Sequence, residues 1–330
     1  MKRTPVREED SGVFHRAPTV YRLLPTADAE ILATAFLDHG SLVGSVIPPP
    51  AVVLVPGFSG TIRRPAVRSV AEGLRWHASV VMVETRGHGR STGTCTFGDR
   101  EVLDVDAAVG EARRLGHERV VTVGWSMGGA AVVRHAALAS EETPVHGHRL
   151  RNRPDAVVTV SATSRWFVRD TAPLRRILWM AETRTGRLMA RTVFGVRIPS
   201  RPWPELPSER PPAPVDLIGQ VAPTPLLIVH GDLDGYFTLD HPRALAAAAG
   251  PRARLWIVPG FGHAETGVVP GLVDRIGRYL PYLLDGHRHD SMFSMDNVWE
   301  TSVKYIGHGP GSPPSPAAAR RVVLDGPGGP

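Results

Sequence analysis

The chain has 330 residues, of which 42% are hydrophobic and 21% charged, and its formal net charge is +6. This length and apolar content suffice for one α/β core of about 250 residues plus an insertion. No apolar run reaches the roughly 18 residues of a membrane helix, residues 1–10 lead into polar sequence rather than a signal peptide, and the single Cys95 excludes an internal disulfide, so we expect a cytoplasmic protein.

Strands and helices are predicted to alternate along most of the chain. After a polar arm over residues 1–16, Val20–Leu24 and Ala29–Leu37 indicate an antiparallel hairpin. Six further strands are predicted at Ala51–Val55, Val80–Glu84, Val120–Val123, Ala156–Val160, Leu226–His230 and Leu255–Val258. Helical stretches such as Arg64–Trp76 and Arg100–Leu115 separate them. The pattern predicts an α/β fold with a mostly parallel, doubly wound sheet, in which reactive groups gather at the strand C-termini.

The stretch from about residue 164 to 221 breaks this alternation between the sixth and seventh strands and is predicted to form a cap. Four apolar residues recur there at helical spacing and indicate one short amphipathic helix: Leu174, Ile177, Leu178 and Ala181. Residues 199–214 are proline-rich and are expected to be irregular. The apolar stripe either roofs an active site or packs against the core, and the sequence leaves both interpretations open.

The cap is strongly basic. Residues 165–201 include nine arginines but only two acidic residues, Asp170 and Glu182. Such a surface attracts anionic substrates, contacts a membrane or is simply solvated. We favour the solvated surface over membrane contact, because Lys2 and Lys304 are the only lysines and the arginine content therefore reflects a general bias. No nucleic-acid-binding module is recognisable, so no nucleic-acid partner is expected.

The C-terminal tail, residues 286–330, carries little information. His287, His289 and Asp290 give only a weak metal-binding pattern, and we expect no metal. Residues 307–330 are rich in Gly, Pro, Ala and Ser and are predicted to be disordered.

The most informative motif is Gly-Trp-Ser-Met-Gly at residues 124–128, which lies between a β-branched run and an alanine-rich stretch over residues 130–139. In a strand, sharp turn and helix of this kind, the serine adopts a strained backbone conformation and projects its Oγ from the sheet edge. The N-terminal N–H groups of the helix favour negative charge beside it. Ser126 is therefore the candidate nucleophile, whereas Cys95 has no such context.

A nucleophilic serine needs a base, and the base needs an orienting carboxylate. His263 follows the last predicted strand in a glycine-rich loop, which makes it the candidate base. Asp232 and Asp234 both follow the preceding strand. We favour Asp234 as the orienting acid because it lies further out on the loop, and we expect Asp232 to cap the turn.

With these residues in place, the chain from about Val20 to Leu284 resembles α/β-hydrolases of the lipase, esterase and serine-aminopeptidase type. The order of nucleophile, acid and histidine is that of this fold, and the spacing of Asp234 matches it. Residues 84–91, Glu-Thr-Arg-Gly-His-Gly-Arg-Ser, resemble the family's Asp-x-Arg-Gly-x-Gly-x-Ser run after strand 4, with Glu84 replacing aspartate. The resemblance implies a structural role for His88.

The resemblance also implies an oxyanion hole formed by backbone N–H groups. The loop after strand 3, where the family often carries His-Gly, here reads Pro-Gly-Phe-Ser-Gly at residues 56–60. By this resemblance the donors are the N–H groups of Phe58 and Met127.

Asp104 and Asp106 are expected on the solvated outer face of the helix after strand 4.

The implied domain covers residues 17–285, and its implied reaction is acyl transfer from a small-molecule substrate to water through an acyl-enzyme, without metal or organic cofactor. Carboxylester hydrolysis is the favoured activity. Aminopeptidase or amidase activity, transfer to an alcohol and perhydrolysis use the same residues and stay open. Epoxide hydrolases and dehalogenases of this fold use an aspartate nucleophile, which Ser126 argues against. A ligand-binding protein without turnover is a further alternative. The sequence does not indicate an oligomeric state.

Overall fold

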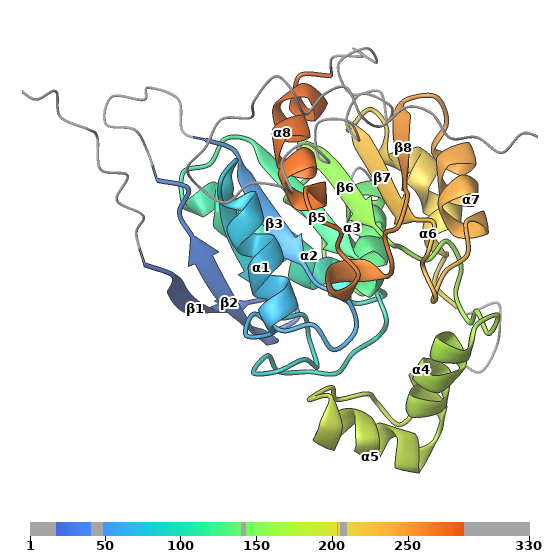
Figure 1. The fold of residues 1–330 in the computed structure, drawn as a ribbon. Coiled ribbons are helices and arrows are strands. Elements are labelled where there is room, and N and C mark those ends of the chain that lie inside the picture. Colours follow the sequence, from blue (N-terminus) through green and yellow to red (C-terminus); the bar gives the residue numbers. More distant parts are fainter. Residues whose placement is uncertain (1–17, 41–48, 140–142, 203, 205–209, 287–330) are drawn as a thin grey trace, which may run out of the picture. The chain divides into compact units, whose positions relative to one another are not determined.

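The computed structural model describes residues 18–40, 49–139, 143–202, 204 and 210–286. The predicted arm, and the predicted tail apart from Gly286, lie outside these ranges. The eight strands are β1 (Val20–Pro25), β2 (Ile31–Leu37), β3 (Ala51–Val55), β4 (Ser79–Val83), β5 (Val120–Trp125), β6 (Ala156–Val160), β7 (Leu226–Gly231) and β8 (Ala253–Val258). They form one sheet in the order β1-β2-β4-β3-β5-β6-β7-β8 (Figure 1).

The sheet is antiparallel only at the β1 end, where β2 pairs with β1 and β4, and the remaining pairs are parallel. Strands β3, β4, β5, β6 and β7 are buried along their whole length. Their near-continuous runs of valine, isoleucine and leucine are typical of parallel strands covered on both faces. The predicted hairpin and the mostly parallel sheet are confirmed.

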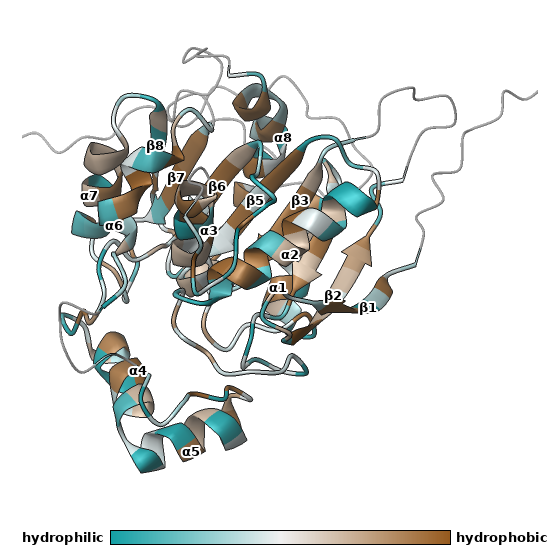
Figure 2. Cartoon of the chain, turned by 180° about the vertical axis from the view of Figure 1, so that it is seen from behind, coloured by the Kyte–Doolittle hydropathy of each residue, from teal (hydrophilic) through white to brown (hydrophobic). Residues whose placement is uncertain are grey.

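The helices are α1 (Pro65–Leu74), α2 (Glu101–Arg114), α3 (Met127–Leu138), α4 (Ala172–Glu182), α5 (Arg184–Val193), α6 (Pro214–Leu217), α7 (Asp240–Ala249) and α8 (Leu272–Leu284), with short 3-10 helices η2 (Ile218–Val221) and η3 (Ala264–Thr266). Helices α1 and α8 cover one face of the sheet, and α2, α3 and α7 cover the other, where the mainly apolar colouring of the strands in Figure 2 shows what they bury. No helix in the described ranges combines the length and apolar composition that spanning a bilayer requires.

The predicted cap contains two helices, α4 and α5, where the sequence predicted one. Met180 and Ala181 of α4 and Ala190 of α5 pack with Cys95 and Met127 of the main domain. The apolar stripe of α4 therefore covers the region around Ser126, the serine in the turn between β5 and α3. Helix α6 and η2, at the end of the predicted insertion, instead contribute to the core beside α3.

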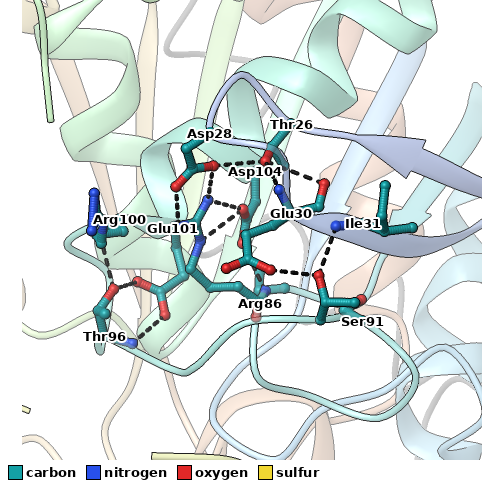
Figure 3. Close-up of polar contacts among 12 residues, drawn as sticks. Thr26, Asp28, Glu30, Ile31, Arg86, Ser91, Thr96, Arg100, Glu101 and Asp104 are labelled. Carbon is teal, nitrogen blue, oxygen red and sulfur yellow. Dashed lines mark hydrogen bonds and ion pairs between the residues drawn. The ribbon is translucent and has the colours of Figure 1, made fainter. Parts of the chain in front are cut away.

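A buried ionic network joins the β1–β2 turn, the loop after β4 and α2 (Figure 3). The guanidinium of Arg86 donates to Asp28 at 2.7 and 3.0 Å and to Asp104 at 2.7 and 2.9 Å. Asp104 is fully buried, and the buried Asp106 accepts from His135 and from two backbone N–H groups. The expectation that both carboxylates are solvated was wrong, because Arg86 reaches Asp104 from the loop after β4, and α3 together with residues 151–152 supplies the partners of Asp106.

Replacing Arg86 with leucine should lower the free energy of unfolding by about 3–5 kcal/mol, because it leaves buried carboxylates without their cation. Burial alone raises the pKa of Asp28, but the hydrogen bonds and charge of Arg86 lower it to about 2, from an ordinary value of 3.8. The stabilisation from this carboxylate is therefore present above pH 3.8 and lost as the pH falls toward 2. Urea unfolding at several pH values measures both effects.

The matched control is Arg90→Leu. Arg90 follows Arg86 in the same loop, but its side chain is exposed. Its replacement should change stability by no more than about 0.5 kcal/mol. Equal losses in the two variants would contradict a stabilising role of the network.

Candidate active site

Ser126 occupies the turn between β5 and α3. Its backbone has φ 52° and ψ −115°, a sparsely populated conformation for a residue with a side chain, and such strain gathers at functional sites. Its N–H donates to the carbonyl of Val160 on β6 at 2.8 Å, which fixes the turn over the end of the sheet. The side chain is largely buried but lines a cavity.

The two motif glycines allow this turn to form at close range. A Cβ atom on Gly128 would lie 2.2 Å from the carbonyl oxygen of Val55 at the end of β3. One on Gly124 would lie 2.3 Å from the carbonyl oxygen of Gly128. Only glycine therefore lets the first turn of α3 lie against the strand ends, which holds the serine at the sheet edge.

His263 lies in the loop after β8, directly before η3. Its Nε2 is 2.9 Å from Ser126 Oγ. The ring of Tyr236 stacks on the imidazole at 4.1 Å between centroids, and the ring of Phe237 lies edge-on at 5.5 Å. The Ser161 hydroxyl accepts from the N–H of Ala264, the next residue. These contacts orient the imidazole toward the serine.

Asp234 completes a chain of hydrogen bonds. Its carboxylate oxygens lie 2.8 and 2.9 Å from His263 Nδ1, and it also accepts from the N–H groups of Tyr236 and Phe237. Burial raises the pKa of Asp234, but the hydrogen bond and charge of His263, together with the backbone donor at Phe237, bring it below the ordinary value. Asp232 is exposed and accepts from the N–H of Gly260 instead.

This arrangement brings together the three side chains that the sequence singled out. An imidazole bonded to a buried carboxylate on one nitrogen and to a hydroxyl on the other can accept the hydroxyl proton. Of the two candidate acids, the structure places Asp234 against His263 and Asp232 elsewhere.

The residues of the two predicted oxyanion donors lie beside the serine. Phe58 and Met127 line the same cavity as Ser126. Within the described ranges neither N–H donates to a carbonyl or side chain. The preceding N–H, that of Gly57, is bound instead by Glu265 Oε1 at 2.8 Å. Unsatisfied N–H groups beside a nucleophile suit a developing negative oxygen.

Two cavities of different character meet at Ser126, and both are also lined by Phe58 and Ile177. The smaller, of about 80 Å³, is walled mainly by aromatic and aliphatic side chains, including Phe97, Trp166, Phe167, Leu174, Leu178 and Phe237. The larger, of about 330 Å³, is lined by many polar groups, including Ser59, Arg176, Tyr236, His263, Glu265 and Thr266. We call them the apolar and the polar pocket.

Some residues of the site escaped the sequence analysis. Glu265 contacts Gly57 in the loop of residues 56–60, and Tyr236 contacts His263. The sequence signal for each was its closeness to the candidate base or acid. His88 lies outside the cluster, buried, with Nδ1 near the Thr85 hydroxyl and the Arg86 carbonyl.

Cys95 also lies outside the cluster of Ser126, His263 and Asp234. It is buried with its Sγ 3.6 Å from Met127 Sδ, and burial raises the pKa of its thiol, which disfavours the thiolate. This side chain packs against Met127, the residue that follows Ser126 in the turn.

Comparisons with known proteins agree with this architecture. A sequence model described as the Alpha/beta hydrolase family matches residues 52–275. The esterase Pf2001 of Pyrococcus furiosus is 19% identical with a TM-score of 0.58, covering 82% of this chain and 93% of that one. A hypothetical protein of Pseudomonas aeruginosa is 16% identical with a TM-score of 0.60, covering 86% of this chain and 99% of that one. At these identities the likeness concerns the fold. Among curated proteins, none matches the sequence significantly.

Proposed function

This chain belongs to the alpha/beta hydrolase family, and we propose that it is a serine hydrolase that cleaves a carboxylic ester through an acyl-enzyme. The observation that carries the proposal is the unbroken chain of hydrogen bonds from Ser126 Oγ through His263 to Asp234. The N–H groups of Phe58 and Met127, for which the described part of the chain offers no other acceptor, support the same reaction, because acyl transfer develops negative charge on the carbonyl oxygen.

In the first half-reaction, Ser126 Oγ attacks the ester carbonyl while His263 Nε2 takes the hydroxyl proton. The carboxylate of Asp234 accepts from Nδ1–H, which keeps Nε2 free as the base and stabilises the imidazolium that forms. The N–H groups of Phe58 and Met127 receive the oxyanion, and each such donor is worth about 10² to 10³ in turnover. Collapse of the tetrahedral intermediate breaks the bond to the alcohol oxygen, which takes the proton from Nε2.

In the second half-reaction, water occupies the place of the alcohol. His263 removes a proton from the water as its oxygen attacks the acyl-enzyme, and the same proton returns to Ser126 Oγ when the acid leaves. The products are an alcohol and a carboxylic acid. The likeness in fold to a protein described as an esterase makes esters the first substrates to test.

The test combines covalent labelling by a fluorophosphonate with hydrolysis of p-nitrophenyl esters of increasing acyl length and of aminoacyl anilides. We expect labelling, ester hydrolysis and slower anilide cleavage, with the fastest acyl group reporting the size of the apolar pocket. Faster anilide cleavage would favour an amidase or aminopeptidase. Labelling without any hydrolysis would favour a binding protein.

A further inference from the structure

We propose that the polar pocket binds the alcohol part of the substrate, that this alcohol is a polyol, and that Glu265 determines the preference for it. The inference rests on the proposed ester hydrolysis at Ser126. It adds the class of leaving group and the residue that recognises it.

The position of the imidazole decides which pocket receives which part of the ester. His263 must protonate the alcohol oxygen as it leaves. The histidine lines the polar pocket and is not among the residues of the apolar one, whereas Met127 lines only the apolar pocket. The alcohol therefore departs through the polar pocket, and the acyl group lies against the aromatic rings of the apolar pocket.

Glu265 presents a fixed carboxylate to the departing alcohol. It lies in η3, two residues after His263, and the N–H of Gly57 binds its Oε1 at 2.8 Å. Within the described ranges no side chain donates a hydrogen bond to this carboxylate or forms an ion pair with it. One oxygen is thus anchored to the loop of residues 56–60. Burial raises the pKa of this carboxyl group, whereas the Gly57 N–H and the positive charges of His263 and Arg64 oppose that rise. The carboxylate keeps acceptor capacity for a ligand.

Arg176 determines which donors suit this pocket. It belongs to α4, is exposed, and lines the polar pocket together with Glu265. A substrate ammonium group would be attracted by the Glu265 carboxylate and repelled by the Arg176 guanidinium. A substrate anion would be repelled by the carboxylate and attracted by the guanidinium. A substrate hydroxyl group can donate a hydrogen bond to the Glu265 carboxylate and accept one from the Arg176 guanidinium. The hydroxyls of Ser59 and Thr266 add further hydrogen-bonding partners in the same pocket. Neutral polyols fit this mixture of charges.

The experiment compares esters that share one acyl group, the fastest of the p-nitrophenyl series, and differ in the alcohol: ethyl, 2,3-dihydroxypropyl, choline and 2-sulfoethyl. We expect kcat/KM for the dihydroxypropyl ester to exceed that of the other three by about tenfold, the effect of one hydrogen bond to a charged group. In Glu265→Gln, whose amide oxygen still accepts from Gly57, the ratio of dihydroxypropyl to ethyl ester should fall several-fold. In Glu265→Leu the preference should vanish.

The matched control is Glu118→Gln, because Glu118 is an exposed carboxylate in the segment that precedes β5, outside both pockets. The ratio should stay at the wild-type value in this variant. A ratio near one in the wild type, a preference that persists in Glu265→Gln and Glu265→Leu, or faster hydrolysis of the choline or sulfoethyl ester would each overturn the inference. A lack of fluorophosphonate labelling would count against the proposed function itself.

Discussion

Ser126→Ala should abolish fluorophosphonate labelling and lower kcat for the best p-nitrophenyl ester by about 10⁴- to 10⁶-fold. The variant removes the hydroxyl oxygen that lies 2.9 Å from His263 Nε2 and that attacks the carbonyl in the proposed mechanism. Its backbone hydrogen bond to Val160 is retained, so the fold should persist. Labelling, steady-state kinetics and circular dichroism on the same preparation separate loss of chemistry from loss of structure.

The control for this variant is Ser69→Ala, which changes an exposed serine on α1. It should leave labelling and turnover at the wild-type level. Persistent labelling of the Ser126→Ala protein at the wild-type rate would show that another side chain reacts, and the proposed mechanism would then be wrong.

The sheet and the strand–turn–helix unit around Ser126 could be predicted from the sequence because local patterns specify them. The apolar runs of β3 and β6 were predicted with the bounds that the structure has, Ala51–Val55 and Ala156–Val160. The glycines at 124 and 128 mark the close approach of α3 to the strand ends. In these segments periodicity, β-propensity and steric demand all favour the same structure.

Features that depend on distant partners could not be predicted in this way. Asp104 has the sequence context of a solvated helical residue, but Arg86 reaches it from the loop after β4. Helix α5 was missed because its arginine- and threonine-rich sequence has few apolar residues and a glycine, Gly186, near its start. The Thr183 side chain caps the helix by accepting from Gly186 N–H. Glu265 contacts Gly57 across 208 positions.

The acid of the site illustrates the same limit at short range. Asp232 and Asp234 lie in one turn and are the same residue type, so only their positions in the loop distinguish them in the sequence. The backbone N–H groups of Tyr236 and Phe237 orient Asp234 toward the imidazole. These bonds depend on the turn conformation.

Asp234→Asn should therefore lower kcat by about 10⁴-fold, whereas Asp232→Asn should be tolerated. An amide at 234 can donate to Nδ1 of His263, which places the ring proton on Nε2 and removes the base from Ser126. The pKa of Asp234 lies below 3.8, so the carboxylate is charged throughout the neutral range. Raising the pH above neutrality should not restore the activity of this variant, because the missing group is not one that titrates there. The test is to measure kcat with the best p-nitrophenyl ester over a range of about two pH units on either side of neutrality.

Asp232→Asn is the matched control, since it makes the same chemical change two residues away. Its amide oxygen can still accept from the N–H of Gly260, which Asp232 Oδ1 binds at 2.7 Å, so the turn should keep its conformation. The side chain is exposed and does not contact the imidazole. If Asp232→Asn were the more damaging of the two substitutions, the carboxylate that orients His263 during turnover would be Asp232, and the turn would have to rearrange when substrate binds.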